Sequence, residues 1–316
     1  MEKPLYMWGI FIGIVLFLLI LDLGVFHRQD REISFKESLW MTLFYVIMAF
    51  LFGLWVWYIK GLDGFAEYIT GFLVEKSLAL DNIFVISLIF TSLSIPLKYQ
   101  HRVLFWGILG VIVLRAIMIG LGAQMIAEFH WILYIFAAFM IFTGIKMLFM
   151  SDKPVEISEN LLLIWMRKHL SITDKLHENK FFLRLVDPVS KKRKFFVTPL
   201  FIALVMVEFI DLVFAVDSIP AIFAITQDTY IVYTSNIFAI LGLRALYFAL
   251  ASIINQFHYL KYALAIVLIF IGAKIFIADA FGLAKIPPLL SLIVTLSILI
   301  GGVLVSFMKK KNMEAQ

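Results

Sequence analysis

The sequence contains no cysteine among its 316 residues. A chain without thiols forms no disulfides and offers no zinc-thiolate site, no iron–sulfur ligation and no thiol nucleophile. Any metal ligand in this protein is therefore an oxygen or an imidazole nitrogen. Two nucleotide-binding motifs are absent as well, because the chain has neither a GxxxxGK[ST] phosphate loop nor a dinucleotide fingerprint. We therefore expect no enzymatic activity and no cofactor, and any transport must draw on existing gradients rather than on ATP.

Charged residues are also scarce. They make up 16% of the chain and hydrophobic residues make up 63%, well above the roughly 45–50% that is typical of soluble domains. The mean hydropathy is +0.99, and long apolar runs alternate with short polar segments. This composition excludes a soluble enzyme and predicts an all-α polytopic membrane protein.

Apolar windows of about 19 residues, the usual length for finding membrane spans, divide the chain into nine predicted transmembrane helices. The first of them has no small-residue cleavage site after its apolar run, so we expect it to be retained rather than removed as a signal peptide. The nine predicted spans are residues 4–26, 38–59, 64–93, 102–126, 129–150, 197–225, 230–253, 258–280 and 287–308.

The distribution of Lys and Arg predicts the orientation of these spans. Nineteen of these residues fall on one side of the membrane and three on the other. Because cytoplasmic loops are enriched in Lys and Arg, the crowded side is predicted to face the cytoplasm, with the N-terminus outside and the C-terminus inside. This topology accounts for the net charge of +5, so nucleic acid is not an expected partner.

The longest polar segment, residues 151–196, lies on the predicted cytoplasmic side. An apolar run from Leu161 to Trp165 precedes Arg167 and Lys168, which is typical of a short amphipathic helix on the inner leaflet. The basic run Lys191-Lys192-Arg193-Lys194 favours contact with anionic membrane lipid. A solvated connector that only enforces topology is the alternative interpretation.

Two parts of the chain carry the same features in the same order. The matched features are Glu75 and Asp81 with Asp211 and Asp217, Asn82 with Ser218, Arg115-Ala116 with Arg244-Ala245, and Ile141-Phe142-x-Gly144-x-Lys146 with Ile269-Phe270-x-Gly272-x-Lys274. Each unit holds three predicted spans, so the two units cross the membrane in opposite senses and form an inverted repeat. Such repeats commonly build transporters whose substrate site lies at the bilayer midplane. Duplication for stability alone is the alternative.

This repeat predicts five parts of the chain. They are residues 1–63 with two N-terminal helices, 64–150 as the first repeat of three helices, 151–196 as the basic cytoplasmic loop, 197–280 as the second repeat of three helices, and 281–316 as the last helix with a basic tail.

Several acidic residues lie well inside the predicted spans. An unpaired ionised carboxylate at the bilayer centre is unfavourable by about 2.5–3.5 kcal/mol even on the milder insertion scale, so these groups are expected to face a protein interior. Carboxylates together with neutral amide and hydroxyl oxygens suit a hard divalent cation. The predicted metal ligands are Glu75, Asp81, Asn82, Glu208, Asp211, Asp217 and Ser218, and their predicted charge partners are Arg115 and Arg244. A purely structural network of ion pairs is the alternative.

Helix geometry limits how these ligands converge. At 100° per residue Glu75 and Asn82 share a face, whereas Asp81 points about 120° away. Pro220 follows Asp217 closely and removes a backbone donor, which allows a break in the sixth span like those of discontinuous transporter helices. The first repeat has no corresponding proline near Asp81.

Four strings of the sequence resemble the TerC (tellurium-resistance protein C) family. These strings are Glu75-Lys-Ser-Leu-x-x-Asp81-Asn82, Thr198-Pro-Leu, Glu208-Phe-Ile-Asp211-Leu-Val-Phe-Ala-Val-Asp217-Ser-Ile-Pro and Ser235-Asn-Ile-Phe-Ala-Ile-Leu-Gly-Leu-Arg244-Ala-Leu-Tyr-Phe. The resemblance covers residues 38–308 and is greatest to the Alx-type manganese exporters. It implies a bacterial inner-membrane protein of metal-ion homeostasis. Other relatives are associated with membrane-protein assembly or with loading manganese into secreted enzymes.

The leading hypothesis is thus a secondary Mn²⁺ exporter. Asp81, Asn82, Asp217 and Ser218 would ligate the ion, and Glu75, Glu208 and Asp211 would complete or relay the site. Two alternatives stay open: a membrane scaffold that helps to insert or metallate partner proteins, and an amino-acid or proton carrier. The expected partners are a divalent metal ion as substrate and membrane lipid, with protein partners in the scaffold alternative.

Overall fold

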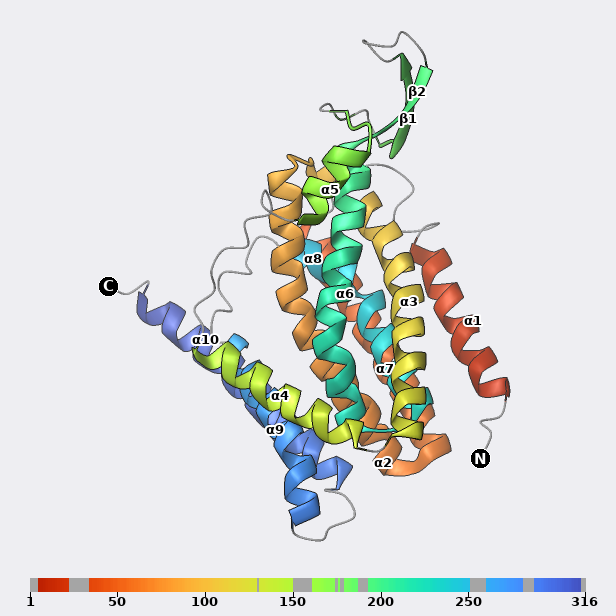
Figure 1. The fold of residues 1–316 in the computed structure, drawn as a ribbon. Helices are drawn as coiled ribbons and strands as arrows, with labels where there is room; N and C mark the ends of the chain where they lie inside the picture. The colour runs from red at the N-terminus through yellow and green to blue at the C-terminus, as the bar shows by residue number, and fades with distance from the viewer. Residues whose placement is uncertain are drawn as a thin grey trace.

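A computed structural model of the chain describes residues 5–22, 34–129, 131–149, 161–173, 176, 179–186, 193–250, 260–280 and 287–313. Figure 1 shows a bundle of roughly parallel helices, crossed at a slant by a second group, with a β-hairpin projecting from one end. The elements are α1 (Leu5–Leu21), α2 (Phe35–Ser92), α3 (Leu97–Glu128), α4 (Ile132–Phe149), α5 (Leu161–His169), β1 (Phe182–Val186), β2 (Arg193–Val197), α6 (Pro199–Ile225), α7 (Thr229–Leu241), α8 (Leu243–Leu250), α9 (Leu260–Ala280) and α10 (Pro288–Met313). The chain is therefore almost entirely α-helical, with one small β-hairpin.

The longest helix, α2, is folded back on itself at Gly61. This glycine has φ 73° and ψ −173°, a conformation that residues with a Cβ rarely adopt. Beyond it the chain returns antiparallel, because the Tyr68 hydroxyl donates to the carbonyl of Ala49 at 3.0 Å and Tyr68 also packs against Gly53. Two of the predicted spans, 38–59 and 64–93, are therefore the two legs of α2.

Local signals set the ends of α6 and α7. Pro199 stands in the first turn of α6, where its missing N–H needs no partner. Asp228 caps α7, because its Oδ1 accepts from the backbone N–H of Tyr230 at 2.9 Å and of Ile231 at 3.3 Å. A bend of 41° at Gly242 then separates α7 from α8, so this predicted span is a broken helix.

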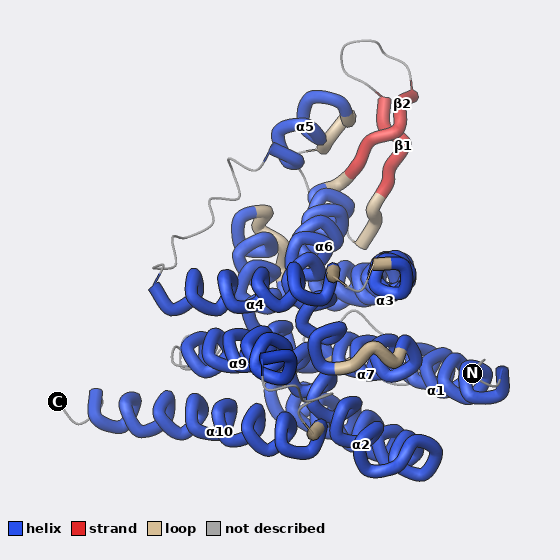
Figure 2. Tube along the Cα trace, turned by 60° about the horizontal axis from the view of Figure 1, so that its bottom comes forward, coloured by secondary structure: helices blue, strands red, loops and turns tan. Residues whose placement is uncertain are grey.

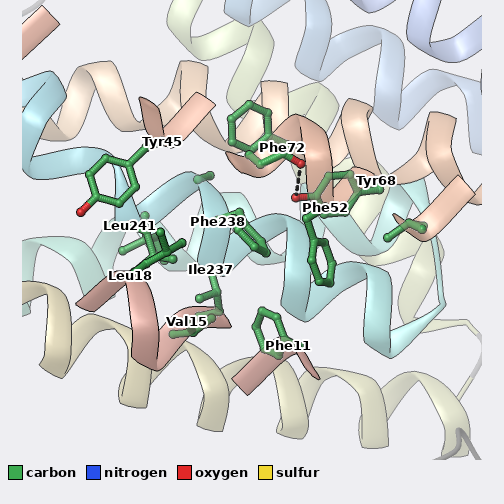
Figure 3. Close-up of a cluster of buried hydrophobic side chains, with 14 of the residues drawn as sticks. Phe11, Val15, Leu18, Tyr45, Phe52, Tyr68, Phe72, Ile237, Phe238 and Leu241 are labelled. Atoms are coloured by element: carbon green, nitrogen blue, oxygen red, sulfur yellow. Dashed lines mark hydrogen bonds between the residues drawn. The ribbon is translucent and has the colours of Figure 1, made fainter. Parts of the chain in front are cut away.

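The core of the main bundle joins α1, α2 and α7. Figure 3 shows Phe11 of α1, Phe52 of α2 and Phe238 of α7 facing one another. The rings of Phe52 and Phe238 lie 4.7 Å apart, and those of Phe11 and Phe52 lie 5.9 Å apart. Aromatic packing thus attaches the N-terminal helix to the first leg of α2 and to α7 of the second predicted repeat.

The slanted group consists of α4, α9 and α10, which lie side by side in Figure 2. Two glycines let α4 and α9 approach closely. A Cβ at Gly144 would lie 2.6 Å from the carbonyl oxygen of Ala265, and a Cβ at Gly272 would lie 2.5 Å from that of Ala137. Small residues commonly permit such close helix packing in membranes.

Enlarging either glycine is expected to destabilise the protein by about 1–3 kcal/mol, because a side chain would push the two backbones apart. Gly144→Val and Gly272→Val should lower the midpoint of thermal unfolding of the purified protein in detergent. Gly13→Ala in α1 is the control, since its Cβ meets no described atom within 4 Å. Equal midpoints for all three variants would contradict a close α4–α9 contact.

Five helices of the described residues are long and apolar enough to cross a membrane, and a sixth crossing arises if α7 and α8 count as one bent span. The apolar parts of α1 and α9 that the structure describes are shorter, Leu5–Leu21 and Tyr262–Ile277. The protein is thus embedded in a membrane through several helices, whereas the count of nine spans stays a prediction.

The segment between α4 and α6 differs from the expected connector. The predicted short helix is present as α5, with Leu163 and Met166 buried and Ile164 and Trp165 exposed. An antiparallel hairpin follows, in which Phe182 of β1 pairs with Val197 of β2. From sequence alone, the alternating pattern of a short β-hairpin is hard to distinguish from the pattern of a polar loop. Lys191 and Lys192 of the basic run lie outside the described residues.

Candidate functional site

Arg115 of α3 lies at the centre of a buried polar cluster. The residue is only 1% exposed, and it contacts side chains from three other helices. Its partners are Glu75 of α2, Asp211 and Ser218 of α6, and Asn236 of α7. The site is therefore built where α2, α3, α6 and α7 meet inside the main bundle.

The guanidinium of Arg115 binds Asp211 through two parallel hydrogen bonds. Its Nε lies 3.1 Å from Oδ2 and its Nη2 lies 3.0 Å from Oδ1. Its Nη1 donates to Glu75, to the Ser218 hydroxyl at 3.0 Å and to the Asn236 amide oxygen at 3.3 Å. Such two-pronged pairing fixes both distance and orientation, and a lysine could not reproduce it.

Two asparagines complete the network. The side-chain amide of Asn82 donates to Asp211 at 3.3 Å, and that of Asn236 donates to Glu75 at 3.1 Å. Asn236 was not among the predicted site residues. The available signal was the polar run Thr234-Ser235-Asn236 inside an apolar span, which the structure buries completely.

A narrow cavity adjoins this network. Its volume is about 10 Å³, close to the room that one water molecule needs. Asn82, Asp211 and Arg244 line it together with apolar side chains of α2, α3, α6 and α8. Asn82 is 4% exposed, and its Oδ1 has no hydrogen-bond partner among the described residues. A residue that lines the cavity thus carries a buried oxygen without a hydrogen-bond partner among the described residues.

Glu208 lies apart from the Arg115 network. It precedes Asp211 by one turn of α6 and is half-buried beside Gly110 of α3, where a Cβ would collide with its carboxylate. Its Oε2 has no hydrogen-bond partner among the described residues. Gly110 therefore provides the space in which this carboxylate sits.

Asp81 and Asp217, two further predicted ligands, have side chains outside the described part of the structure. Their backbones are described, and both lie within continuous helix. In particular α6 runs through Pro220 without ending, so the break that this proline allows does not occur. The break near the site lies instead at Gly242, between α7 and α8.

The two predicted arginine partners have different surroundings. Arg115 pairs with Glu75 and Asp211, whereas Arg244 pairs with Asp22, which directly follows α1. Asp22 was not among the predicted site residues, since it stands at the end of a span where polar residues are common. Lys76 is not one of the hydrogen-bond partners in the described cluster; its Nζ donates to the carbonyl of Ala239 at 3.0 Å.

The network combines two carboxylates with one guanidinium. Among the side chains that the structure describes, no group of three or more His, Asp or Glu is arranged to hold a metal ion. Arg115 instead lies between Glu75 and Asp211 and pairs with both. The described network is therefore one in which a guanidinium bridges two buried carboxylates.

The sequence is similar to several bacterial membrane proteins. An uncharacterized membrane protein of Rickettsia bellii is 52% identical over 309 residues, covering 98% of this chain and 99% of its own length. An uncharacterized membrane protein of Myxococcus xanthus is 45% identical over 306 residues, covering 97% and 93%. The "Putative membrane-bound redox modulator Alx" of Salmonella typhi is 43% identical over 303 residues, covering 93% and 91%. No solved structure matches the chain.

The match to a family is equally extensive. Residues 60–314 match the integral membrane protein TerC family, a range that includes every described member of the Arg115 network. The extent of this match and the identities of 43–52% to full-length relatives lead to one conclusion: the chain belongs to the TerC family of integral membrane proteins.

Proposed function

We propose that this protein is a secondary transporter that exports Mn²⁺ across the bacterial cytoplasmic membrane. The observation that carries the proposal is the buried network of Glu75, Asp211 and Arg115. Two carboxylates against one guanidinium leave a negative charge inside the bundle, and Asp81 and Asp217 lie on the same helices. Buried carboxylates within membrane spans commonly mark ion pathways.

The available donors suit manganese. The oxygens of Asp211, Glu75, Asn82 and Ser218 are hard ligands, and the absence of cysteine disfavours soft metal ions. In this proposal Asp81, Asn82, Asp217 and Ser218 ligate the ion, and Glu75, Glu208 and Asp211 complete the site. In this proposal Arg115, which pairs with Glu75 and Asp211, gives up these contacts when the ion binds.

Alternating access is proposed to use an inverted repeat of residues 64–150 and 197–280. Its support is a reciprocal contact between α4 and α9: Gly144 packs against Ile269, and Gly272 packs against Ile141. In the sequence repeat Gly144 corresponds to Gly272, and Ile141 corresponds to Ile269. A two-fold relation between the two units produces such a reciprocal pair of contacts. Rocking of one unit against the other would then open the site to each side in turn.

The word "redox" in the name of the Salmonella typhi relative suggests a different chemistry. A chain without cysteine has no thiol to oxidise or to exchange. We therefore propose that this protein would influence redox balance only through the ions it moves.

A scaffold for partner proteins is the second candidate function. The hairpin of β1 and β2 supports it, because it projects beyond the helices (Figure 1) and exposes Phe182, Arg184 and Phe195. Substitutions in this hairpin should then impair function more than substitutions in the buried acidic network. The exporter proposal predicts the opposite ranking.

The deciding experiment is elemental mass spectrometry of manganese-loaded cells that express wild type, Asp217→Ala or an empty vector at matched membrane levels. Only wild type should lower cellular manganese. If wild type retains as much manganese as the vector, export is wrong. If Asp217→Ala lowers manganese like wild type, export stands but the ligand assignment of Asp217 is wrong.

A further inference from the structure

Lys76 is a charged residue of α2 that lies inside a predicted span and outside the Arg115 network. Its side chain is partly buried, and among the side chains that the structure describes none forms an ion pair with it. Its Nζ donates to the carbonyl oxygen of Ala239 on α7 at 3.0 Å. Charged groups at such a depth are rare and commonly functional. The partner of this ammonium is thus the backbone of another helix.

Ala239 lies in the last turn of α7, just before the break that separates α7 from α8. In a continuous helix its carbonyl would accept from the N–H of residue 243, but α7 ends at Leu241 and the two helices are bent by 41°. The Lys76 ammonium binds this carbonyl at the C-terminal end of α7, where the helix dipole favours a positive charge. Lys76 is therefore a cap for the broken end of α7 that a different helix supplies.

Gly242, the residue at the break, leaves room for this ammonium. A Cβ at position 242 would lie 2.8 Å from the Lys76 Nζ and 3.0 Å from the Cβ of Tyr45. Gly242 has φ −85° and ψ 3°, a conformation that residues with a Cβ also adopt. The glycine is therefore needed for space and not for its backbone conformation. An alanine at this position would displace the ammonium, which is the far end of a flexible side chain.

The residue before Lys76 holds the same helix about one turn earlier. Glu75 accepts from the side-chain amide of Asn236 at 3.1 Å, and it also pairs with Arg115. Two consecutive residues of α2 therefore contact α7, at Asn236 and at Ala239. A displacement of Glu75 is passed to the broken end of α7 through these two contacts.

We propose that Lys76 is a positioning residue that clamps the end of α7 to α2, so that both move as one body and the bend at Gly242 is the hinge to α8. Hinges are commonly a few residues at the ends of helices. The part of this inference that concerns manganese rests on the proposed function, because ion binding at Glu75 would drive the hinge. The clamp itself is a property of the metal-free protein, and Lys76 contributes no ligand.

The test compares Lys76→Met, which removes the ammonium at similar side-chain length, with Gly242→Ala, which displaces it. Ser77→Ala is the matched control, because the Ser77 hydroxyl donates to the carbonyl of Leu73 within α2 itself. Hydrogen exchange of the backbone amides of residues 239–246 is measured on the full-length protein without metal. The Kd for Mn²⁺ and the maximal rate of Mn²⁺ uptake into proteoliposomes are measured on the same preparations.

Both variants should speed exchange at the break about tenfold, the effect of losing one hydrogen bond to a charged group. The maximal uptake rate per folded molecule should fall several-fold at an unchanged Kd, because the ligands stay in place and only the conformational step is slower. Ser77→Ala should change none of these quantities. A merely structural contact predicts faster exchange throughout the bundle and an unchanged uptake rate per folded molecule, and that result would overturn the clamp. Gly242→Ala decides the matter if Lys76→Met does not fold.

The readouts separate the two proposals. If wild type takes up Mn²⁺ but exchange at the break is the same in all variants, the clamp is wrong and the proposed function stands. If wild type takes up no Mn²⁺ but Lys76→Met and Gly242→Ala speed exchange only at the break while Ser77→Ala does not, the clamp stands and manganese transport is wrong.

Discussion

Replacing Arg115 with glutamine is expected to destabilise the protein by about 3–5 kcal/mol, the typical loss when a buried ion pair is left with one member. Arg115 is almost completely buried and binds Glu75 and Asp211 at once. Its removal leaves two carboxylates inside the bundle without a cation. Most of the protein should then fail to accumulate in the membrane, or should unfold at a much lower temperature in detergent.

Two companion variants make this expectation specific. Arg115→Lys keeps the charge but loses the two-pronged bond to Asp211, so its stability should lie between those of wild type and Arg115→Gln. Arg184→Gln is the matched control, because Arg184 is exposed on β1, and it should leave the unfolding midpoint unchanged. An Arg115→Gln protein as stable as Arg184→Gln would show that the guanidinium does not hold the acids together.

A double variant separates stability from function. Adding Glu75→Gln to Arg115→Gln removes one of the two buried carboxylate charges that lack a cation, and it should recover part of the lost stability. It should not recover manganese export, since it also removes a proposed ligand. Recovery of both would favour the alternative in which the cluster is a structural network only.

Much of the fold was predictable because membrane spans leave a strong signal. The long apolar runs of this chain coincide with described helices, and the position of Gly61 between two such runs is where α2 reverses direction. The α4–α9 contact also has a sequence signal, the two matched glycines. Hydropathy and glycine placement are local properties, so one sequence suffices to find them.

Partner choice among charged groups was less predictable. Glu75 and Asp211 both pair with Arg115, but Arg244 pairs with Asp22, far away in the chain. Such pairing depends on how α1 packs against α7, which no spacing along the sequence encodes.

The position of the helix break was not predictable either. Pro220 lies inside a continuous α6, because neighbouring helices and local adjustment can stabilise a proline within a membrane helix. The actual break lies at Gly242, where a Cβ would come within 3.0 Å of the Tyr45 side chain on α2.

Asp211→Asn is expected to reduce manganese export by about 100-fold, the upper end of the effect reported for groups that merely support a metal ligand. The substitution preserves the shape of the side chain and one acceptor for Arg115 and Asn82. It removes the negative charge that faces both Arg115 and the cavity. Uptake of Mn²⁺ by proteoliposomes measures the effect, and Asp63→Asn is the matched control because Asp63 is exposed on α2.

The loss of Mn²⁺ uptake per folded molecule distinguishes a structural role of Asp211 from a role in ion binding. If it only stabilises Arg115, Asp211→Asn should lower the amount of folded protein but leave the uptake of each folded molecule unchanged. If it attracts or binds the ion, uptake per folded molecule should fall even in protein that elutes as a single species on size exclusion. Glu208→Gln should reduce Mn²⁺ uptake per folded molecule by less than Asp211→Asn does, since Glu208 lies one turn from Asp211 but outside the Arg115 network. Full uptake by folded Asp211→Asn protein would therefore remove Asp211 from the ion pathway and leave it a structural partner of Arg115.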